Sequence, residues 1–112
     1  MAIVTEAIHT GEYLLSQAPG TISHDKVTVA AGDALPAGQL LTKAADGTYA
    51  PFVAADAATA PADAVLYASL PASAGERSAT ATVRLAEVVQ SLLTGYDATA
   101  VAGLAAHFII VR

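Results

Sequence analysis

Short hydrophobic runs separated by turn signals make up most of the chain, and this pattern predicts a β-rich fold. β-branched and aromatic residues concentrate in the runs, and Gly, Pro or Asp residues stand between them. The pair Asp46-Gly47 predicts a tight hairpin, because glycine readily adopts the positive φ that such turns need. The strands expected on this basis are 12–16, 27–29, 39–42, 48–53, 65–70, 79–89 and 107–112.

The longest of these expected strands, 79–89, alternates between two faces in the way a single β-strand does. Alternate side chains of a strand point to the same side of its sheet. One face is therefore expected to carry Ala81, Val83, Leu85, Glu87 and Val89. A lone glutamate on that face suggests a position near a strand end or an interface.

One short helix is expected near the carboxyl-terminal end of the chain. Apolar residues recur at helical spacing after Asp97, which can cap the first turn, and the helix is expected to end at about Ala106. Segments 54–64 and 71–78 predict surface loops. The expected fold class is mainly β, or β-rich α+β: a small compact single domain of short strands with one short helix.

The first twelve residues show no clean periodicity and predict a separate arm. Ile3, Val4 and Ile8 alternate irregularly with threonine, glutamate and His9. Such a segment is expected to be flexible and to become ordered only by docking. The chain is accordingly divided into an arm, 1–12, and a β-rich domain, 13–112.

Composition limits how large a core this domain can build. Hydrophobic residues make up 54% of the 112-residue chain, but alanine is the commonest of them, and there are only two Phe, four Tyr and no Trp. Alanine buries little area per residue, so the core is thin for its length. A thin core favours additional burial against a partner, either another copy or a larger surface.

The charge of the chain argues against two classes of partner. Five Lys and Arg residues stand against ten Asp and Glu, for a formal net charge of −5, and the five cations are scattered along the sequence. Nucleic acid and anionic membrane surfaces both attract clustered cations, so neither is expected as a partner.

The sequence also predicts neither export nor a membrane span. The amino-terminal stretch carries Glu6 and Glu12 among its apolar residues and lacks the basic start of a signal peptide. The uncharged apolar stretch 98–111 is too short to cross a bilayer. No cysteine is present, which excludes disulfides and thiolate zinc sites.

Catalytic and metal-binding patterns are weak throughout the chain. The three histidines, His9, His24 and His107, lie far apart in sequence, and no serine stands in a nucleophile motif. His24-Asp25 is the one candidate pair for metal binding or proton transfer, although a turn entering the next strand explains it more simply. No catalytic residue, metal or cofactor is expected.

The four tyrosines, Tyr13, Tyr49, Tyr67 and Tyr96, leave a binding function open. Gathered on one exposed face, they would form a carbohydrate-binding platform. Spread one to a segment, they are more typical of core or interface packing with a hydrogen-bonded hydroxyl. A receptor- or carbohydrate-binding module is therefore the alternative function, and an enzyme using His24 and Asp25 is the third.

The order of motifs along the chain resembles the phage lambda-type head decoration (capsid cement) protein family. The similarity covers about residue 11 to the carboxyl terminus. Its elements are Gly11 to Ser16, Ser23 with Val27-Thr28-Val29 and Gly32, Leu35 to Leu41, Asp46 to Tyr49, Ala64 to Tyr67, Val83-Arg84 through Val88-Val89, and Leu104 with Phe108 to Arg112.

This resemblance implies a structural protein of the virion rather than an enzyme. Members of the family are small β-rich proteins, often trimers, that sit at three-fold positions on the outer surface of the expanded phage head and stabilise it against internal DNA pressure. The implied partners are the major capsid protein and further copies of the chain. The implied location is the virion surface, preceded by the host cytoplasm before assembly.

The resemblance also implies a role for the arm. In this family the amino-terminal segment engages the shell, commonly by adding a strand to a sheet of the capsid protein. Unpaired backbone groups would supply the affinity, and apolar side chains would fill pockets. The residues expected to bind the capsid are Ala2, Ile3, Val4, Thr5, Ile8 and His9.

Overall fold

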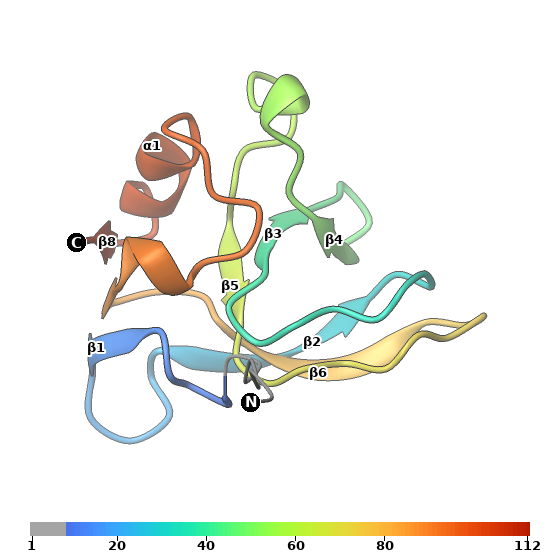
Figure 1. The fold of residues 1–112 in the computed structure, drawn as a ribbon, viewed down its shortest axis with the longest axis horizontal. Coiled ribbons are helices and arrows are strands. Elements are labelled where there is room, and N and C mark those ends of the chain that lie inside the picture. The colour runs from blue at the N-terminus through green and yellow to red at the C-terminus, as the bar shows by residue number, and fades with distance from the viewer. Residues whose placement is uncertain (1–8) are drawn as a thin grey trace, which may run out of the picture.

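The computed structural model describes residues 9–112, which form two small sheets and one short α-helix (Figure 1). The strands are β1 (Leu14–Gln17), β2 (His24–Val29), β3 (Leu40–Lys43), β4 (Tyr49–Pro51), β5 (Ala64–Leu66), β6 (Arg77–Thr82), β7 (Ala86–Val88) and β8 (Ile109–Val111). The helix α1 spans Ala100–Ala105, and single 3-10 turns lie at Ala54–Asp56 and Gln90–Leu92. The predicted β-rich class with one short late helix is confirmed.

Five of the strands close into a small barrel in the order β2-β4-β3-β5-β6. The longest pairing is antiparallel between β2 and β6, from His24 opposite Thr82 to Val29 opposite Arg77. A single parallel pair, Val29 with Tyr49, joins β2 to β4 and closes the barrel. β2 and β6 therefore run together as a long ribbon that extends away from the helix (Figure 1).

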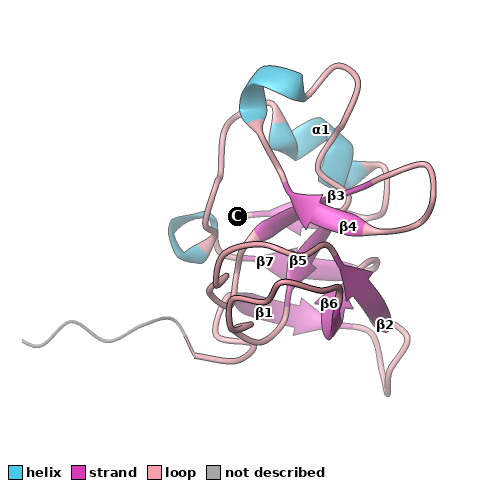
Figure 2. Cartoon of the chain, turned by 90° about the vertical axis from the view of Figure 1, so that its right-hand side faces the viewer, coloured by secondary structure: helices cyan, strands magenta, loops and turns pink. Residues whose placement is uncertain are grey.

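The other three strands form a second sheet in the order β1-β7-β8. β1 and β7 are antiparallel, with a register shift between Leu14 and Ser16, while β7 and β8 are parallel. A parallel neighbour needs a crossover connection, and here the crossover contains α1. Figures 1 and 2 show α1 and β1 on opposite sides of the molecule, with β5 between them.

The buried side chains separate into two clusters, and β3 and β5 contribute to both. Leu41 from β3 and Leu66 from β5 belong to a cluster with Val29, Tyr49 and Ala81. Their chain neighbours Leu40 and Val65 belong to the other cluster, which holds Tyr13, Phe52, Val88, Leu93, Leu104 and Ile109. Since alternate strand residues face opposite ways, these two strands form a wall with a core on each side.

The hairpin predicted at Asp46-Gly47 is confirmed, and Gly38 has a similar backbone conformation. Asp46-Gly47 joins antiparallel β3 and β4, with Gly47 at φ 90° and the Thr48 amide donating to the Asp46 carboxylate. Gly38 has φ 89°, and a Cβ placed there would lie 2.4 Å from the carbonyl oxygen of Leu92. Only glycine fits that second position without displacing the backbone of another segment.

The single strand expected over 79–89 is wrong, because the chain leaves one sheet and enters the other within it. β6 ends at Thr82 and pairs in the barrel, whereas β7 begins at Ala86 and pairs with β1 and β8. Leu85 between them has φ 52°, which breaks the alternation. The expected common face does not exist: Ala81 is in one core, and Leu85 is exposed.

Smaller differences from the expected boundaries concern the ends of single elements. The expected strand 65–70 ends at Leu66, and the expected loop 71–78 ends sooner because β6 begins at Arg77. The loop 54–64 contains a 3-10 turn. The expected capping by Asp97 is not found, because α1 begins at Ala100 with Thr99 as its N-cap and has no side-chain cap hydrogen bond. The Asp97 carboxylate instead accepts hydrogen bonds from the amide and the hydroxyl of Thr99, at 3.0 and 2.8 Å, in the turn just before the helix.

Candidate functional site

The predicted capsid-binding arm falls mostly outside the described residues. Ala2, Ile3, Val4, Thr5 and Ile8 lie there, and their role stays a prediction, as does the division of the chain at residue 12. His9 is described: it is exposed, its carbonyl accepts from the Glu12 amide, and its Nδ1 lies 3.6 Å from Glu12 Oε1. The described chain therefore begins with a turn over 9–12.

Gly11 fixes the place where the arm joins the body. Its amide donates to the Tyr67 carbonyl at 2.9 Å, and its own carbonyl accepts from the Leu14 amide. Gly11 has φ 68°, and a Cβ there would lie 3.0 Å from the Tyr67 ring. Tyr13, two residues on, is fully buried. The connection is thus held by backbone and core contacts and requires glycine at this point.

A chain of hydrogen bonds runs from the surface into the core beneath this connection. The His24 ring contacts Gln17 Oε1 through Nε2 and Thr82 Oγ1 through Nδ1, the latter at 3.1 Å. Thr82 Oγ1 lies 2.6 Å from the Tyr13 hydroxyl, which also donates to the Val65 carbonyl at 3.4 Å. Burial raises the pKa of Tyr13 and lowers the pKa of His24.

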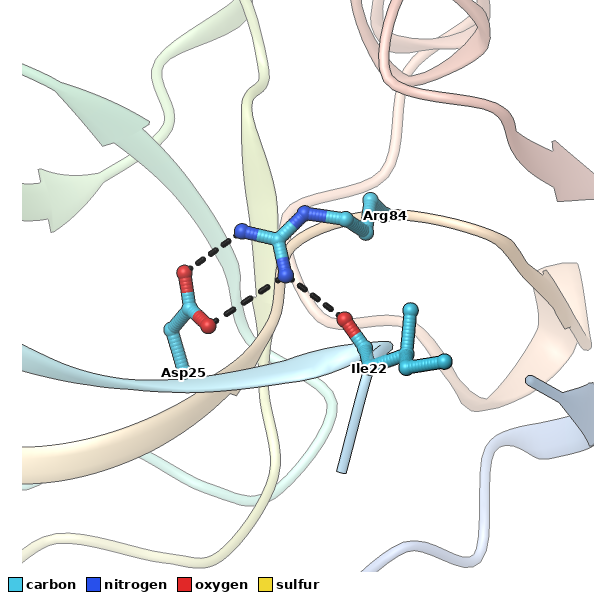
Figure 3. A network of polar contacts seen from close by, with 3 residues as sticks. All are labelled: Ile22, Asp25 and Arg84. Carbon is cyan, nitrogen blue, oxygen red and sulfur yellow. Dashed lines mark hydrogen bonds and ion pairs between the residues drawn. The ribbon is translucent and has the colours of Figure 1, made fainter. Parts of the chain in front are cut away.

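His24 and Asp25, the candidate chemical pair, have separate partners. His24 belongs to the chain just described and lies with its ring centroid 4.9 Å from that of Tyr67. Asp25 forms a two-pronged ion pair with Arg84, whose Nη2 lies 2.6 Å from Oδ2, and Arg84 Nη1 also donates to the Ile22 carbonyl (Figure 3). The Arg84 hydrogen bond lowers the pKa of Asp25. The two side chains do not form one site.

The tyrosines do not gather on an exposed face. Tyr13 and Tyr49 are buried, and they lie in different core clusters. Tyr67 and Tyr96 are partly buried against the cluster that contains Tyr13. The tyrosines therefore pack in or against the cores. They do not form the exposed aromatic platform that a carbohydrate-binding module would need.

Concave or metal-binding sites are not found in the described part of the chain. Over residues 9–112 there is no ligand-sized pocket and no group of three or more His, Asp or Glu side chains placed to hold a metal ion. Within the same residues, no helix is long and apolar enough to cross a membrane.

The surface of residues 9–112 exposes several large apolar side chains. They are Leu15, Ile22, Val53, Leu85, Val101, Phe108 and Ile110. Leu85 and Phe108 are the two described non-glycine residues with positive φ, at 52° and 60°. No local sequence signal identifies them, because Leu and Phe rarely adopt this conformation.

Comparison with known proteins gives one match. The family model for bacteriophage lambda head decoration protein D matches residues 3–109 of the 112-residue chain. No curated protein and no solved structure matches. The match covers most of the arm, strands β1 to β7 and the helix, and ends at the first residue of β8, in agreement with the ordered motifs. The chain belongs to the bacteriophage lambda head decoration protein D family.

Proposed function

We propose that this chain binds the outer surface of the expanded phage head at three-fold positions, as a trimer, and stabilises the shell against internal DNA pressure. Its family makes it a structural decoration protein of the phage capsid. The proposal adds the lattice position, the trimer and the mechanical role. Its partner on the shell is the major capsid protein, and before assembly the protein resides in the host cytoplasm.

The observation that carries the proposal is the extent of the family match. It begins at residue 3, so it includes the arm as well as the folded body. A segment that served only as a frayed end would have no reason to share the family pattern. This supports a role for Ile3, Val4, Thr5 and Ile8 in the function common to the family.

The chemistry of the arm suits addition of a strand to a sheet edge. Ile3, Val4 and Thr5 are β-branched, which favours extended backbone. Backbone hydrogen bonds to an open edge give affinity with little dependence on sequence, and alternate side chains fill pockets. Because Gly11 fixes the end of the arm that joins the body, each copy presents the arm from the same place.

Weak single contacts are sufficient for a stable cement when copies are linked. Once one arm of a trimer is bound, the other two bind at a high effective concentration. Protein that binds only the expanded shell also shifts the equilibrium toward that state by mass action. No bond-making chemistry is needed at any step.

The test is co-sedimentation of the full-length protein with decoration-free shells of the cognate phage, unexpanded and expanded. Saturation on expanded shells alone, at three copies for each three-fold position, is the expected result. Binding to neither form would contradict the proposal. Equal binding to both forms would contradict the stabilisation of the expanded state.

The arm is tested with charge substitutions at positions before the described residues. Ile3→Asp combined with Val4→Asp is expected to abolish binding to expanded shells and leave thermal unfolding unchanged. Thr10→Asp, at an exposed position in the turn that follows, serves as the matched control. Undiminished binding by the double variant would assign shell recognition to the body instead.

A further inference from the structure

Asp46 is the one aspartate of the chain that is followed by glycine, and it lies exposed in the turn between β3 and β4. An Asp-Gly pair is the aspartyl bond most prone to isomerisation, because glycine has no Cβ to hinder attack on the carboxyl group. Every other aspartate precedes lysine or alanine, and the sequence contains no asparagine. Spontaneous rearrangement of the backbone is therefore concentrated at Asp46-Gly47.

The reaction is a ring closure within the chain. The backbone nitrogen of Gly47 attacks Cγ of Asp46 and a C–N bond forms. One carboxyl oxygen leaves as water, with the amide proton and the carboxyl proton. Water then opens the resulting succinimide at either carbonyl. Opening at Cγ restores aspartate, whereas opening at the α-carbonyl leaves the chain joined through the side chain, which adds one atom to the backbone. No oxidant or reductant takes part.

The hydrogen bonds of the hairpin engage both reacting groups with other partners. The Gly47 amide, which supplies the nucleophile, donates to the Ala44 carbonyl at 2.9 Å. The Asp46 carboxylate, which is the group attacked, accepts from the Thr48 amide at 2.9 Å. The Ala44 amide donates to the Thr48 carbonyl at 2.8 Å and fixes the ends of the turn. Ring closure would have to break the first two of these bonds.

Hydrogen bonds from Thr48 also control the protonation of Asp46. The backbone amide of Thr48, and after it the side chain, hold the pKa of Asp46 below its ordinary value. Loss of water requires the neutral carboxyl group, and a lowered pKa leaves less of that form at any given pH. The geometry and the protonation state of the turn therefore both oppose the reaction.

We propose that Asp46-Gly47 is a site of slow isomerisation, and that the hairpin between β3 and β4 suppresses the reaction until the turn opens. Opening does not require unfolding of the whole chain, because exposed turns open at a lower free energy than core strands. The inference goes beyond the proposed binding to the shell and does not depend on it. It concerns every copy of the chain, whether bound or free.

Isomerisation at this turn would act on the closure of the barrel. The extra backbone atom falls between β3 and β4, whose pairing sets Lys43 opposite Tyr49. Tyr49 is buried, and it also forms the parallel pair with Val29 that joins β4 to β2. Because the length of a hairpin loop sets the register of its strands, the isomerised protein is expected to be less stable than the parent.

The experiment ages the full-length protein at mildly acidic pH and physiological temperature, folded in buffer and unfolded in guanidinium chloride. Both samples are then unfolded and digested with endoproteinase Asp-N, which cleaves before aspartate but not before isoaspartate. Isomerisation therefore removes the cleavage between Ala45 and Asp46. Cleavage before Asp56, which is followed by alanine, is the internal control.

The folded chain is expected to accumulate isoaspartate at least about tenfold more slowly than the unfolded chain. Equal rates would overturn the suppression by the hairpin, and an unfolded chain that keeps full cleavage before Asp46 would overturn the site itself. Isomerised protein, separated by ion-exchange chromatography, is expected to unfold at a lower urea concentration than the parent. An unchanged midpoint would contradict the shift in register.

Two variants at one position identify the protecting group. Thr48→Pro removes the amide that donates to Asp46, whereas Thr48→Val keeps the amide and removes the hydroxyl. The proline variant is expected to isomerise several-fold faster than the parent, and the valine variant to stay close to the parent. Circular dichroism verifies that both are folded. Similar rates in the two variants would overturn the role of the amide, and if the proline variant does not fold, the folded and unfolded parent decide the proposal.

Discussion

The guanidinium of Arg77 donates two hydrogen bonds to the carbonyl oxygen of Ala30, from Nε at 3.2 Å and from Nη2 at 2.7 Å. Its Nη1 donates to the carbonyls of Asp33 and Pro71. Arg77 is buried, and each of these acceptors is a backbone carbonyl rather than a carboxylate. One side chain thus joins the two loops at the far end of the β2–β6 ribbon.

Arg77→Lys is expected to lower the free energy of unfolding by about 2–3 kcal/mol, the range for lost hydrogen bonds to a charged group. Lysine keeps the charge but lacks the planar fork that reaches three carbonyls at once. Urea denaturation measures the loss. Lys26→Met, at an exposed position on β2, is the control and is expected to change stability little. A loss no larger than that of the control would show that the loops do not depend on this clamp.

Gly38→Ala and Gly47→Ala separate backbone strain from steric overlap. The two glycines have nearly the same φ, 89° and 90°, but a Cβ at Gly47 meets nothing within 4 Å. Gly47→Ala is expected to cost about 1–2 kcal/mol from strain alone. Gly38→Ala is expected to cost about 1–3 kcal/mol more, because the Cβ overlaps the Leu92 carbonyl. Chemical denaturation of the two variants under one set of conditions gives the difference, and equal losses would contradict the close packing of Gly38.

Thr82→Val is expected to destabilise the protein by about 1–3 kcal/mol, because it leaves the buried Tyr13 hydroxyl without its nearest partner. Tyr13→Phe should restore part of this loss in the Thr82→Val background, since both polar groups are then absent. A double-mutant cycle in urea measures the coupling. Additive losses from the two single changes would show that the hydroxyls do not interact.

The stability of the fold is expected to decrease as pH falls below the ordinary histidine pKa of about 6.5. Burial lowers the pKa of His24 in the folded state, so the unfolded chain takes up the proton first and gains stability relative to the fold. The loss accumulates from the ordinary value down to the lowered folded pKa.

Urea midpoints measured across this pH range, for the parent chain and for His24→Gln, test that expectation. The glutamine variant should show a flatter pH dependence in the same window. Identical slopes would assign the pH dependence to other groups. Acidic residues such as Asp25 and Glu87, whose pKa values are lowered by arginine, act at lower pH and do not interfere.

Much of the fold could be predicted from local signals. The hairpin at Asp46-Gly47 and the turn that precedes the helix depend on hydrogen bonds from Thr48 to Asp46 and from Thr99 to Asp97, within a few residues. The expected strand 79–89 failed for the opposite reason. Its alternation continues through Val83, Leu85 and Glu87, so no residue type marks the passage from one sheet to the other. Only the pairing of β7 with β1 and β8 decides where the chain must turn.

The exposed surface was harder to predict from the sequence than the fold. The arm could be proposed because it lacks periodicity and carries β-branched residues at its start. Leu85 and Phe108 could not, since both are residue types expected in a strand interior. Their exposure follows from a left-handed backbone that long-range hydrogen bonds impose. Where the residue is neither Gly nor Asn, this conformation leaves no signal in the sequence.

β3 and β5 form a wall that the two cores share, so a change in this wall affects both cores. Leu40 and Val65 face one core, while Leu41 and Leu66 face the other, so a shift of either strand by one residue would exchange every side chain between compartments. Losing this shared partition would expose both cores at once. We therefore expect a body with so little apolar bulk to unfold in one cooperative step, so that a shell that carries it would gain a part that is either intact or absent.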